Sequence, residues 1–196
     1  MDNMKNKAVF IDRDGVIISS KNFARSAAEI IYIPHSIDAI RILTENNYSV
    51  FIITNQGGIA LGYTTIDIVE NINSKIDDDI KEAGGRITQI YYCPHHEKGI
   101  IPEYKKICPN RKPATGFIKT AALYHNLDIE NSFFIGDMLS DIKCGKNSGM
   151  KTILVKTGLF EKAVKDGFLY KGEKVEPDYI TDDLYNAVQI IINNSV

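Results

Sequence analysis

The sequence contains no long apolar run. Uninterrupted apolar stretches such as Val50 to Ile53 and Ile190 to Ile192 fall far short of the roughly 18 residues that a transmembrane helix needs. The apolar run that follows Lys5 and Lys7 stops at Asp12, which is too short for the core of a secretory signal peptide. We therefore expect no membrane segment and a cytoplasmic location.

Cysteine is scarce, and the three cysteines make an odd number: Cys93, Cys108 and Cys144. A chain of 196 residues buries enough surface to fold without covalent cross-links. Free thiols or a metal site are therefore expected here in place of a disulfide framework. Cys144 is expected to be an ordinary core residue.

An excess of charge of one sign is also missing. The chain has 23 Lys and Arg against 25 Asp and Glu, which gives a formal net charge of −2. Proteins that bind nucleic acid or membrane surfaces usually carry a basic excess or patch, so neither partner is expected. With 44% apolar and 24% charged residues, no repeat and no linker, the sequence predicts one globular domain over residues 1–196, acting as a monomer.

What the sequence does contain is an alternation of short apolar runs with helical patterns. The expected strands are Ala8–Ile11, Ser49–Ile53, Ile87–Tyr92, Ser132–Ile135, Thr152–Val155 and, weakly, Asp178–Ile180. Apolar residues spaced by three and four predict helices after Ser36, after Thr65 and after Thr115, and a last helix over about Asp182–Asn194. This order is typical of an α/β fold with three layers, a doubly wound and mainly parallel sheet between two layers of helices.

Two long segments, Val16 to Ile33 and Cys93 to Pro113, have neither pattern. Loops of this length in a compact domain are usually functional. Ligands in such folds bind beyond the carboxyl ends of the strands, so residues at those ends are the candidates for a site.

The first expected strand runs directly into Asp12-Arg13-Asp14-Gly15. Side chains of residues 12 and 14 point the same way because strand residues alternate, and Gly15 allows a sharp turn after them. Two carboxylates at this position suit chemistry, but aspartates that merely form the turn explain the motif equally well.

Three other places carry polar residues at the same sheet edge. The second strand ends in Thr54-Asn55-Gln56-Gly57-Gly58, which can cradle an anion with side chains and backbone amides. The fourth ends in Gly136-Asp137, with Asp141 in the first turn of the next helix, where the helix dipole alone also favours a carboxylate. Lys112 precedes the helix that leads back to that strand, and taken alone it reads as an ordinary solvated lysine.

Together, the order Asp-x-Asp-Gly-Val, a strand ending in Thr, Lys, and Gly-Asp-x-x-x-Asp strongly resembles the haloacid dehalogenase (HAD) superfamily of phosphotransferases over nearly the whole chain. The resemblance implies a Mg²⁺-dependent aspartyl-phosphate mechanism. It implies that Asp12 attacks phosphorus, that Asp14 serves as acid and then base, and that Thr54 and Lys112 hold the phosphoryl oxygens. Magnesium would then lie between the carboxylates of Asp12 and Asp137 and the carbonyl of Asp14, with Asp141 in support.

The loop that reads Tyr91-Tyr92-Cys93-Pro94-His95-His96 and then Cys108-Pro109-Asn110-Arg111-Lys112-Pro113 resembles a narrower branch of this superfamily, the heptose 1,7-bisphosphate 7-phosphatases and histidinol-phosphate phosphatases. In that branch a Cys-x-His and a Cys-x-Cys pair bind a structural zinc. Here Cys93, His95 and Cys108 match, but Asn110 stands at the fourth position, and asparagine is a poor zinc ligand. Either the zinc is lost, or a site with three protein ligands is completed by His96 or water.

The same resemblance places substrate contacts at Arg111, at Asn55 and Gln56, and in the loop Ser20, Lys21, Asn22 and Phe23. Two positions depart from the branch: Leu61 where it commonly has a basic residue, and Met138 where it often has lysine. The segment Val16 to Ile33 is too short for a large cap domain, so an open site is expected.

The implied function is removal of the 7-phosphate of D-glycero-D-manno-heptose 1,7-bisphosphate, on a route to the heptose of surface polysaccharides. Histidinol phosphate or another small sugar phosphate is the alternative substrate. A phosphosugar-binding protein without catalysis is the alternative from another class, although such a protein has no need to keep Asp12, Asp14, Lys112 and Asp137 together.

Overall fold

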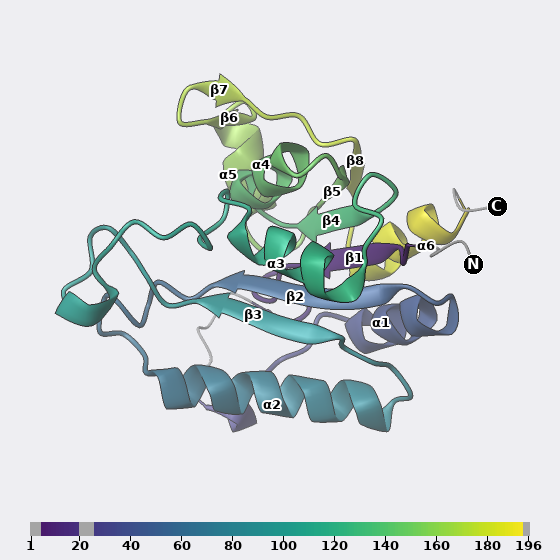
Figure 1. The fold of residues 1–196 in the computed structure, drawn as a ribbon, viewed down its shortest axis with the longest axis horizontal. Coiled ribbons are helices and arrows are strands. Elements are labelled where there is room, and N and C mark those ends of the chain that lie inside the picture. The colour runs from purple at the N-terminus through teal and green to yellow at the C-terminus, as the bar shows by residue number, and fades with distance from the viewer. Residues whose placement is uncertain (1–4, 20–25, 194–196) are drawn as a thin grey trace.

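Six apolar runs form one parallel sheet at the centre of the computed structural model, which describes residues 5–19 and 26–193 (Figure 1). The strands are β1 (Ala8–Ile11), β2 (Ser49–Asn55), β3 (Gln89–Cys93), β4 (Phe133–Gly136), β5 (Lys151–Val155) and β8 (Tyr179–Thr181). Their spatial order is β3-β2-β1-β4-β5-β8, and every neighbouring pair is parallel. The predicted parallel sheet is confirmed, and its first strand lies at the centre.

Helices cover both faces of the sheet and complete the three predicted layers (Figure 1). The helices α1 (Ser36–Glu45), α2 (Ile66–Glu82) and α6 (Leu184–Asn193) pack with one set of strand side chains that includes Val9 and Ile11. The helices α3 (Gly116–His125), α4 (Leu139–Asn147) and α5 (Phe160–Lys165) lie on the other face. Strands buried on both faces explain why the runs are continuously apolar instead of alternating.

Stacked aromatic rings form the centre of the α3 and α4 side. The ring of Phe10 on β1 lies 5.0 Å from that of Phe51 on β2 and 6.3 Å from that of Phe134 on β4. All three side chains are fully buried. Because these rings come from three adjacent strands, they fix the spacing of the strand ends that carry the polar motifs.

Local signals mark the ends of α1 and α2. Thr65 caps α2, since its hydroxyl accepts a hydrogen bond from the Ile68 amide. After α1 the chain turns through Asn47, which has a φ of 61°, and after α2 through Gly84, with a φ of 82°.

The segment between β5 and β8 differs from the prediction. It contains α5 and a two-stranded hairpin of β6 (Leu169–Tyr170) and β7 (Glu173–Lys174), none of which the apolar pattern indicated. The hairpin strands have two residues each and are largely exposed, so they lack the hydrophobic run that marks the sheet strands.

The segment between β1 and α1 contains one short 3-10 helix, Ala27–Glu29, in its described parts. The predicted substrate loop Ser20, Lys21, Asn22 and Phe23 lies outside the described residues. A second 3-10 helix, Pro102–Tyr104, lies in the long segment between β3 and α3. Within residues 5–19 and 26–193, no helix combines the length and the apolar character needed to cross a bilayer.

Candidate active site

The turn after β1 brings the first two aspartates to the edge of the sheet. The Asp12 amide continues the ladder by donating to the Ile135 carbonyl of β4 at 3.0 Å, and the chain then turns at Gly15, which has a φ of 86°. A Cβ atom at position 15 would overlap the carboxylate of Asp137, so only glycine fits there. The turn therefore places the Asp-x-Asp motif against the end of β4.

Lys112 is buried at the centre of this edge, which the sequence alone did not indicate. Its ammonium lies 2.9 Å from the Asp12 carboxylate, 2.7 Å from that of Asp141 and 2.8 Å from the Ile53 carbonyl. Burial acts to lower the pKa of Lys112, but the charges of Asp12 and Asp141 outweigh it and hold that pKa above its usual value. Lys112 therefore stays charged and links β1, β2 and α4.

The side chain of Asn55 fixes the backbone that carries Lys112. Its amide nitrogen donates to the Lys112 carbonyl at 3.1 Å, and its oxygen accepts from the Lys112 amide at 3.0 Å. This two-way clamp ties the long loop between β3 and α3 to the end of β2. Asn55 is a predicted substrate contact, but the donor and the acceptor of its side chain are both hydrogen-bonded to the loop.

Asp14 faces a set of hydrogen-bond donors. The guanidinium of Arg13 contacts its two oxygens at 2.9 and 3.1 Å, the amide of Gln56 donates at 2.7 Å, and the Thr54 hydroxyl donates at 3.3 Å. Arg13 is itself held by the side-chain oxygen of Asn73, at 2.8 Å. The Asp14 side chain is 28% exposed, against 10% for Asp12, so Asp14 is oriented yet reaches the open side of the site.

Asp137 and Asp141 complete the cluster from β4 and α4. One oxygen of Asp137 accepts from the Leu159 amide at 2.8 Å, whereas the other is buried and has no hydrogen-bond partner in the described chain. The carboxylates of Asp12, Asp137 and Asp141 each place an oxygen within 4.8 Å of the others. A buried acceptor without a donor beside two further carboxylates fits a hard divalent cation.

The pKa values in this cluster point to the same need for a cation. Burial, together with the charges of its acidic neighbours, raises the pKa of Asp12 to about 7 although Lys112 acts against the rise. Burial and the charges of Asp12 and Asp141 raise the pKa of Asp137 to about 8. Lys112 alone therefore does not compensate three buried carboxylates.

A second cluster lies in the loop that follows β3. Cys93, His95 and Cys108 place ligand atoms within 4.8 Å of one another, as the sequence predicts. His96 is not in this group; its Nδ1 accepts from the Lys98 amide at 3.0 Å. The side-chain oxygen of Asn110 lies against Gly116 at the start of α3. The structure thus brings together three nitrogen or sulfur donors, one fewer than a closed structural zinc site uses.

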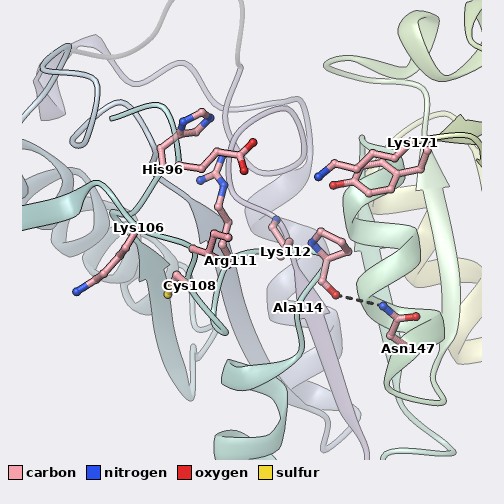
Figure 2. Close-up of a pocket in the computed structure, with 12 residues that line it drawn as sticks. His96, Lys106, Cys108, Arg111, Lys112, Ala114, Asn147 and Lys171 are labelled. Atoms are coloured by element: carbon pink, nitrogen blue, oxygen red, sulfur yellow. Dashed lines mark hydrogen bonds between the residues drawn. The ribbon is translucent and has the colours of Figure 1, made fainter. Parts of the chain in front are cut away.

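A pocket of about 410 Å³ opens beside Lys112. Figure 2 shows it between the loop that carries His96, Lys106 and Cys108 and the wall formed by Asn147 of α4 and Lys171 of the hairpin. Arg111 lies in the middle, where its guanidinium donates to the His95 carbonyl at 3.1 Å and packs against Gly57. Arg111, a predicted substrate contact, therefore lines an open pocket next to the carboxylate cluster.

The structure brings the predicted residues Asp12, Asp14, Thr54, Gln56, Lys112, Asp137 and Asp141 to one sheet edge. Sequence analysis missed Asn73, which is a polar residue on the apolar face of α2, and a buried polar residue at such a position signals a specific partner. It also missed Thr157, whose hydroxyl donates to the Gly15 carbonyl at 2.6 Å. Thr157 is the second residue after the end of β5, so the sheet-edge rule could have found it.

Comparisons with known proteins agree with this geometry. The HAD-hydrolase-like family matches residues 109–187. Over 188 residues the chain is 37% identical to a protein named D-glycero-D-manno-heptose-1,7-bisphosphate 7-phosphatase from Chlorobaculum tepidum, covering 93% of this chain and 92% of that one. Over 159 residues it is 38% identical to a D-glycero-alpha-D-manno-heptose-1,7-bisphosphate 7-phosphatase from Photorhabdus laumondii, covering 81% and 87%.

Among solved structures, a D,D-heptose 1,7-bisphosphate phosphatase from B. bronchiseptica, complexed with magnesium and phosphate, superposes with a TM-score of 0.82. It is 28% identical, and the match covers 96% of this chain and 99% of that one. Since such relatives match nearly the whole chain, this protein belongs to the HAD-like hydrolases, in the family of the heptose bisphosphate phosphatases, and is a phosphatase.

Proposed function

We propose that this phosphatase removes the 7-phosphate of D-glycero-D-manno-heptose 1,7-bisphosphate. The observation that carries the proposal is the cluster of Asp12, Asp14, Asp137 and Lys112 at one sheet edge, opening onto a pocket lined by further cations. Relatives that match over nearly the whole chain are named for this reaction. A cationic pocket also favours a substrate with a second phosphate over histidinol phosphate, which carries an ammonium group.

In the proposed reaction, a carboxylate oxygen of Asp12 forms a bond to phosphorus while the bond from phosphorus to the sugar oxygen breaks. The Arg13 amide, at 2.7 Å, and the Lys112 ammonium both contact Oδ1 of the Asp12 carboxylate, which leaves Oδ2 for attack. Asp14 gives its proton to the departing sugar oxygen and then accepts a proton from the water that hydrolyses the aspartyl phosphate. Thr54 and Lys112 orient the phosphoryl oxygens.

Magnesium fits the residues present, since hard carboxylate oxygens surround the unpartnered oxygen of Asp137. Asp12 and Asp137, with the Asp14 carbonyl, would hold the ion, and Asp141 would support them from the side. When bound, Mg²⁺ offsets the repulsion between the Asp12 carboxylate and the phosphate dianion.

Phosphate release with Mg²⁺ tests the function directly. The substrates are both anomers of heptose 1,7-bisphosphate, histidinol phosphate and simple sugar phosphates, and we expect one heptose anomer to exceed the others by orders of magnitude in kcat/KM. Comparable low activity on all of these substrates would uphold the assignment as a phosphatase but reject heptose 1,7-bisphosphate as the specific substrate. Binding of heptose bisphosphate without turnover in Mg²⁺ would favour the binding-protein alternative.

Without a divalent cation, the unfolding temperature is expected to fall as the pH rises from about 5 to about 8. Asp12 and Asp137 have pKa values of about 7 and about 8 in the folded protein, against an ordinary value of about 4 in the unfolded chain. The folded state therefore holds more protons in this range and loses stability as they leave. Because Mg²⁺ takes the place of these protons, the rise in unfolding temperature on adding Mg²⁺ should grow with pH. A Mg²⁺ effect that is the same at pH 5 and pH 8 would contradict the assignment of these two carboxylates as ligands.

We further propose that Cys93, His95 and Cys108 bind zinc with water as the fourth ligand. Burial lowers the pKa of His95, which keeps its imidazole neutral and able to coordinate. Protein purified without chelator is expected to contain zinc and to lose it readily to a chelator, whereas Asn110→Cys should retain it and Asn110→Ala should match wild type. Zinc content near zero after growth in zinc-supplemented medium would remove the site.

We also propose that the enzyme acts as a monomer in the cytoplasm. All residues placed in the proposed mechanism come from one chain, so catalysis needs no second subunit. A doubly phosphorylated sugar crosses a bilayer poorly, which favours hydrolysis in the compartment where it is made.

A further inference from the structure

The tip of the β6–β7 hairpin places a lysine on the wall of the pocket, across from Arg111. Tyr170 pairs with Glu173, so Lys171 and Gly172 form a two-residue turn between them. Figure 2 shows the Lys171 side chain entering the pocket from the hairpin, toward Arg111 and Lys112. The hairpin thus adds to the pocket a charge that is distant in sequence from the catalytic motifs.

The backbone at this turn does not favour lysine. Lys171 and Gly172 have φ angles of 51° and 84°, the left-handed conformation at both central residues of a two-residue hairpin turn. Asparagine, aspartate and glycine are the residues preferred at the first of these positions. A lysine there is therefore better explained by its side chain than by the turn.

The charge of Lys171 is not neutralised within the described chain. Ion pairs at the hairpin join Lys143 to Glu173 and Lys174 to Glu176, and none involves Lys171. Its ammonium lies 5.9 Å from the centre of the Tyr170 ring, a cation–π contact that does not neutralise its charge. A lysine side chain loses much rotamer freedom when it is ordered, so a ligand that orders Lys171 must attract its ammonium strongly enough to offset that entropy cost.

The remaining charged groups of the pocket point to an anion. Arg111 adds a positive charge, and Glu97 is the one carboxylate among the described lining residues. Lys106 also lines the pocket, but Figure 2 shows its side chain directed away from Lys112 and Lys171. Lys112 is already matched by Asp12 and Asp141. Arg111 and Lys171 therefore outnumber the single acid among the described lining residues.

The pocket has positive groups at two separate places, so it can bind two anionic groups of one ligand. Lys112 lies at its inner end, beside the reacting carboxylate, and Lys171 lies on the opposite wall. A volume of about 410 Å³ is in the range of pockets for small organic ligands. When one phosphate of a sugar bisphosphate reacts at Asp12, the far end of the substrate therefore lies among the other cations of the pocket.

We propose that Lys171 binds the second, non-reacting phosphate of the substrate and so selects bisphosphates over monophosphates. This inference rests on the proposed function, because it requires a sugar with two phosphates. Arg111 receives the same phosphate from the loop side, and the hairpin closes the opposite side with Lys171. Lys171 is then a specificity residue, with no part in the bond-breaking step.

The test combines a change in the enzyme with a change in the substrate. Lys171→Asn removes the charge and puts the preferred Asn-Gly pair into the turn, so the hairpin keeps its geometry. With heptose 1,7-bisphosphate, Lys171→Asn is expected to raise KM about tenfold and to leave kcat within about twofold. With heptose 7-phosphate, both constants should equal those of wild type.

Two further variants serve as matched controls. Lys171→Arg keeps the charge and should restore most of the bisphosphate preference. Lys174→Asn removes a neighbouring charge of the same hairpin that pairs with Glu176 and does not line the pocket, so it should leave both substrates unaffected.

Each outcome decides between the inference and the function on which it rests. If Lys171→Asn loses the same factor in kcat/KM on both substrates, or loses nothing on the bisphosphate, the role of Lys171 is overturned. In either case, turnover of the bisphosphate by wild type upholds the proposed function. If wild type hydrolyses neither heptose substrate but does hydrolyse other phosphate esters, the heptose assignment fails and the inference fails with it. Equal unfolding temperatures for wild type and Lys171→Asn exclude a damaged hairpin as the cause.

Discussion

Asp12→Asn is expected to lower phosphate release by about 10⁴-fold or more while the fold is retained. The asparagine amide has nearly the shape of the carboxylate but is not a nucleophile toward phosphorus. Its burial costs little, because the pKa of Asp12 is already raised to about 7 and Lys112 keeps its contacts with Asp141 and the Ile53 carbonyl. Steady-state phosphate release measures the first effect, and the unfolding temperature, expected within about 5 °C of wild type, measures the second.

Asp14→Asn distinguishes the role of Asp14 as acid and base from the role of Asp12 as nucleophile. With an activated phosphate ester, whose leaving group needs no protonation, this variant should accumulate the acyl phosphate on Asp12 because no base activates water. Rapid acid quenching with labelled phosphate detects that species, which should be missing in Asp12→Asn. Asp67→Asn, an exposed carboxylate in the first turn of α2, is the matched control and should behave as wild type. Labelled Asp12→Asn protein would refute the nucleophile assignment.

Lys112→Met is expected to reduce both catalysis and stability. The ammonium is fully buried and contacts two carboxylates and a carbonyl, so its removal leaves Asp12 and Asp141 without a countercharge. Breaking a buried ion pair in this way costs roughly 3 kcal/mol, which for a chain of this size lowers the unfolding temperature by about 6–12 °C. The loss of a positive group at the phosphate should cost about 10³-fold in kcat.

Lys119→Met provides the control for this variant, since Lys119 is an exposed lysine on α3 in the same part of the chain. Lys119→Met should change neither kcat nor the unfolding temperature. Addition of Mg²⁺ should recover part of the stability lost in Lys112→Met, because the ion supplies a new countercharge to Asp12, but it should not recover the activity. An unfolding temperature equal to that of wild type would mean that the buried pairs of Lys112 are not formed in solution.

Periodicity and the sheet-edge rule were sufficient to predict the sheet and the location of the site. Continuous apolar runs marked the central strands β1, β2, β4 and β5, because strands buried on both faces cannot alternate. The edge strands β3 and β8 are partly exposed, and the sequence indicated β8 only weakly. Asp12 and Asp137 directly follow β1 and β4, and Thr54 lies at the end of the neighbouring strand β2, so a parallel sheet necessarily brings them together. Their position required no knowledge of side-chain contacts.

Contacts between distant segments could not be predicted in the same way. Nothing in the local sequence distinguishes Lys112 from a solvated lysine, since its burial depends on Asp141 and on the Asn55 clamp. The hydrogen bond from the Arg13 guanidinium to the Asn73 side-chain oxygen spans 60 residues and depends on how α2 packs on the sheet. The β6–β7 hairpin is set by its two-residue turn, and its short exposed strands carry no periodic signal.

The central place of β1 in the sheet has a consequence for biosynthesis. This strand is made first and pairs with β2 early, but its other edge must await β4, which begins 122 residues after Ile11, at Phe133. At ribosomal rates of about 5–20 residues per second, that edge stays open for about 6–24 s. During this interval the apolar face of Phe10 lacks its Phe134 neighbour, and the nascent chain presents an unpaired strand to other proteins. A ribosome that stalls between β3 and β4 would therefore release an aggregation-prone fragment.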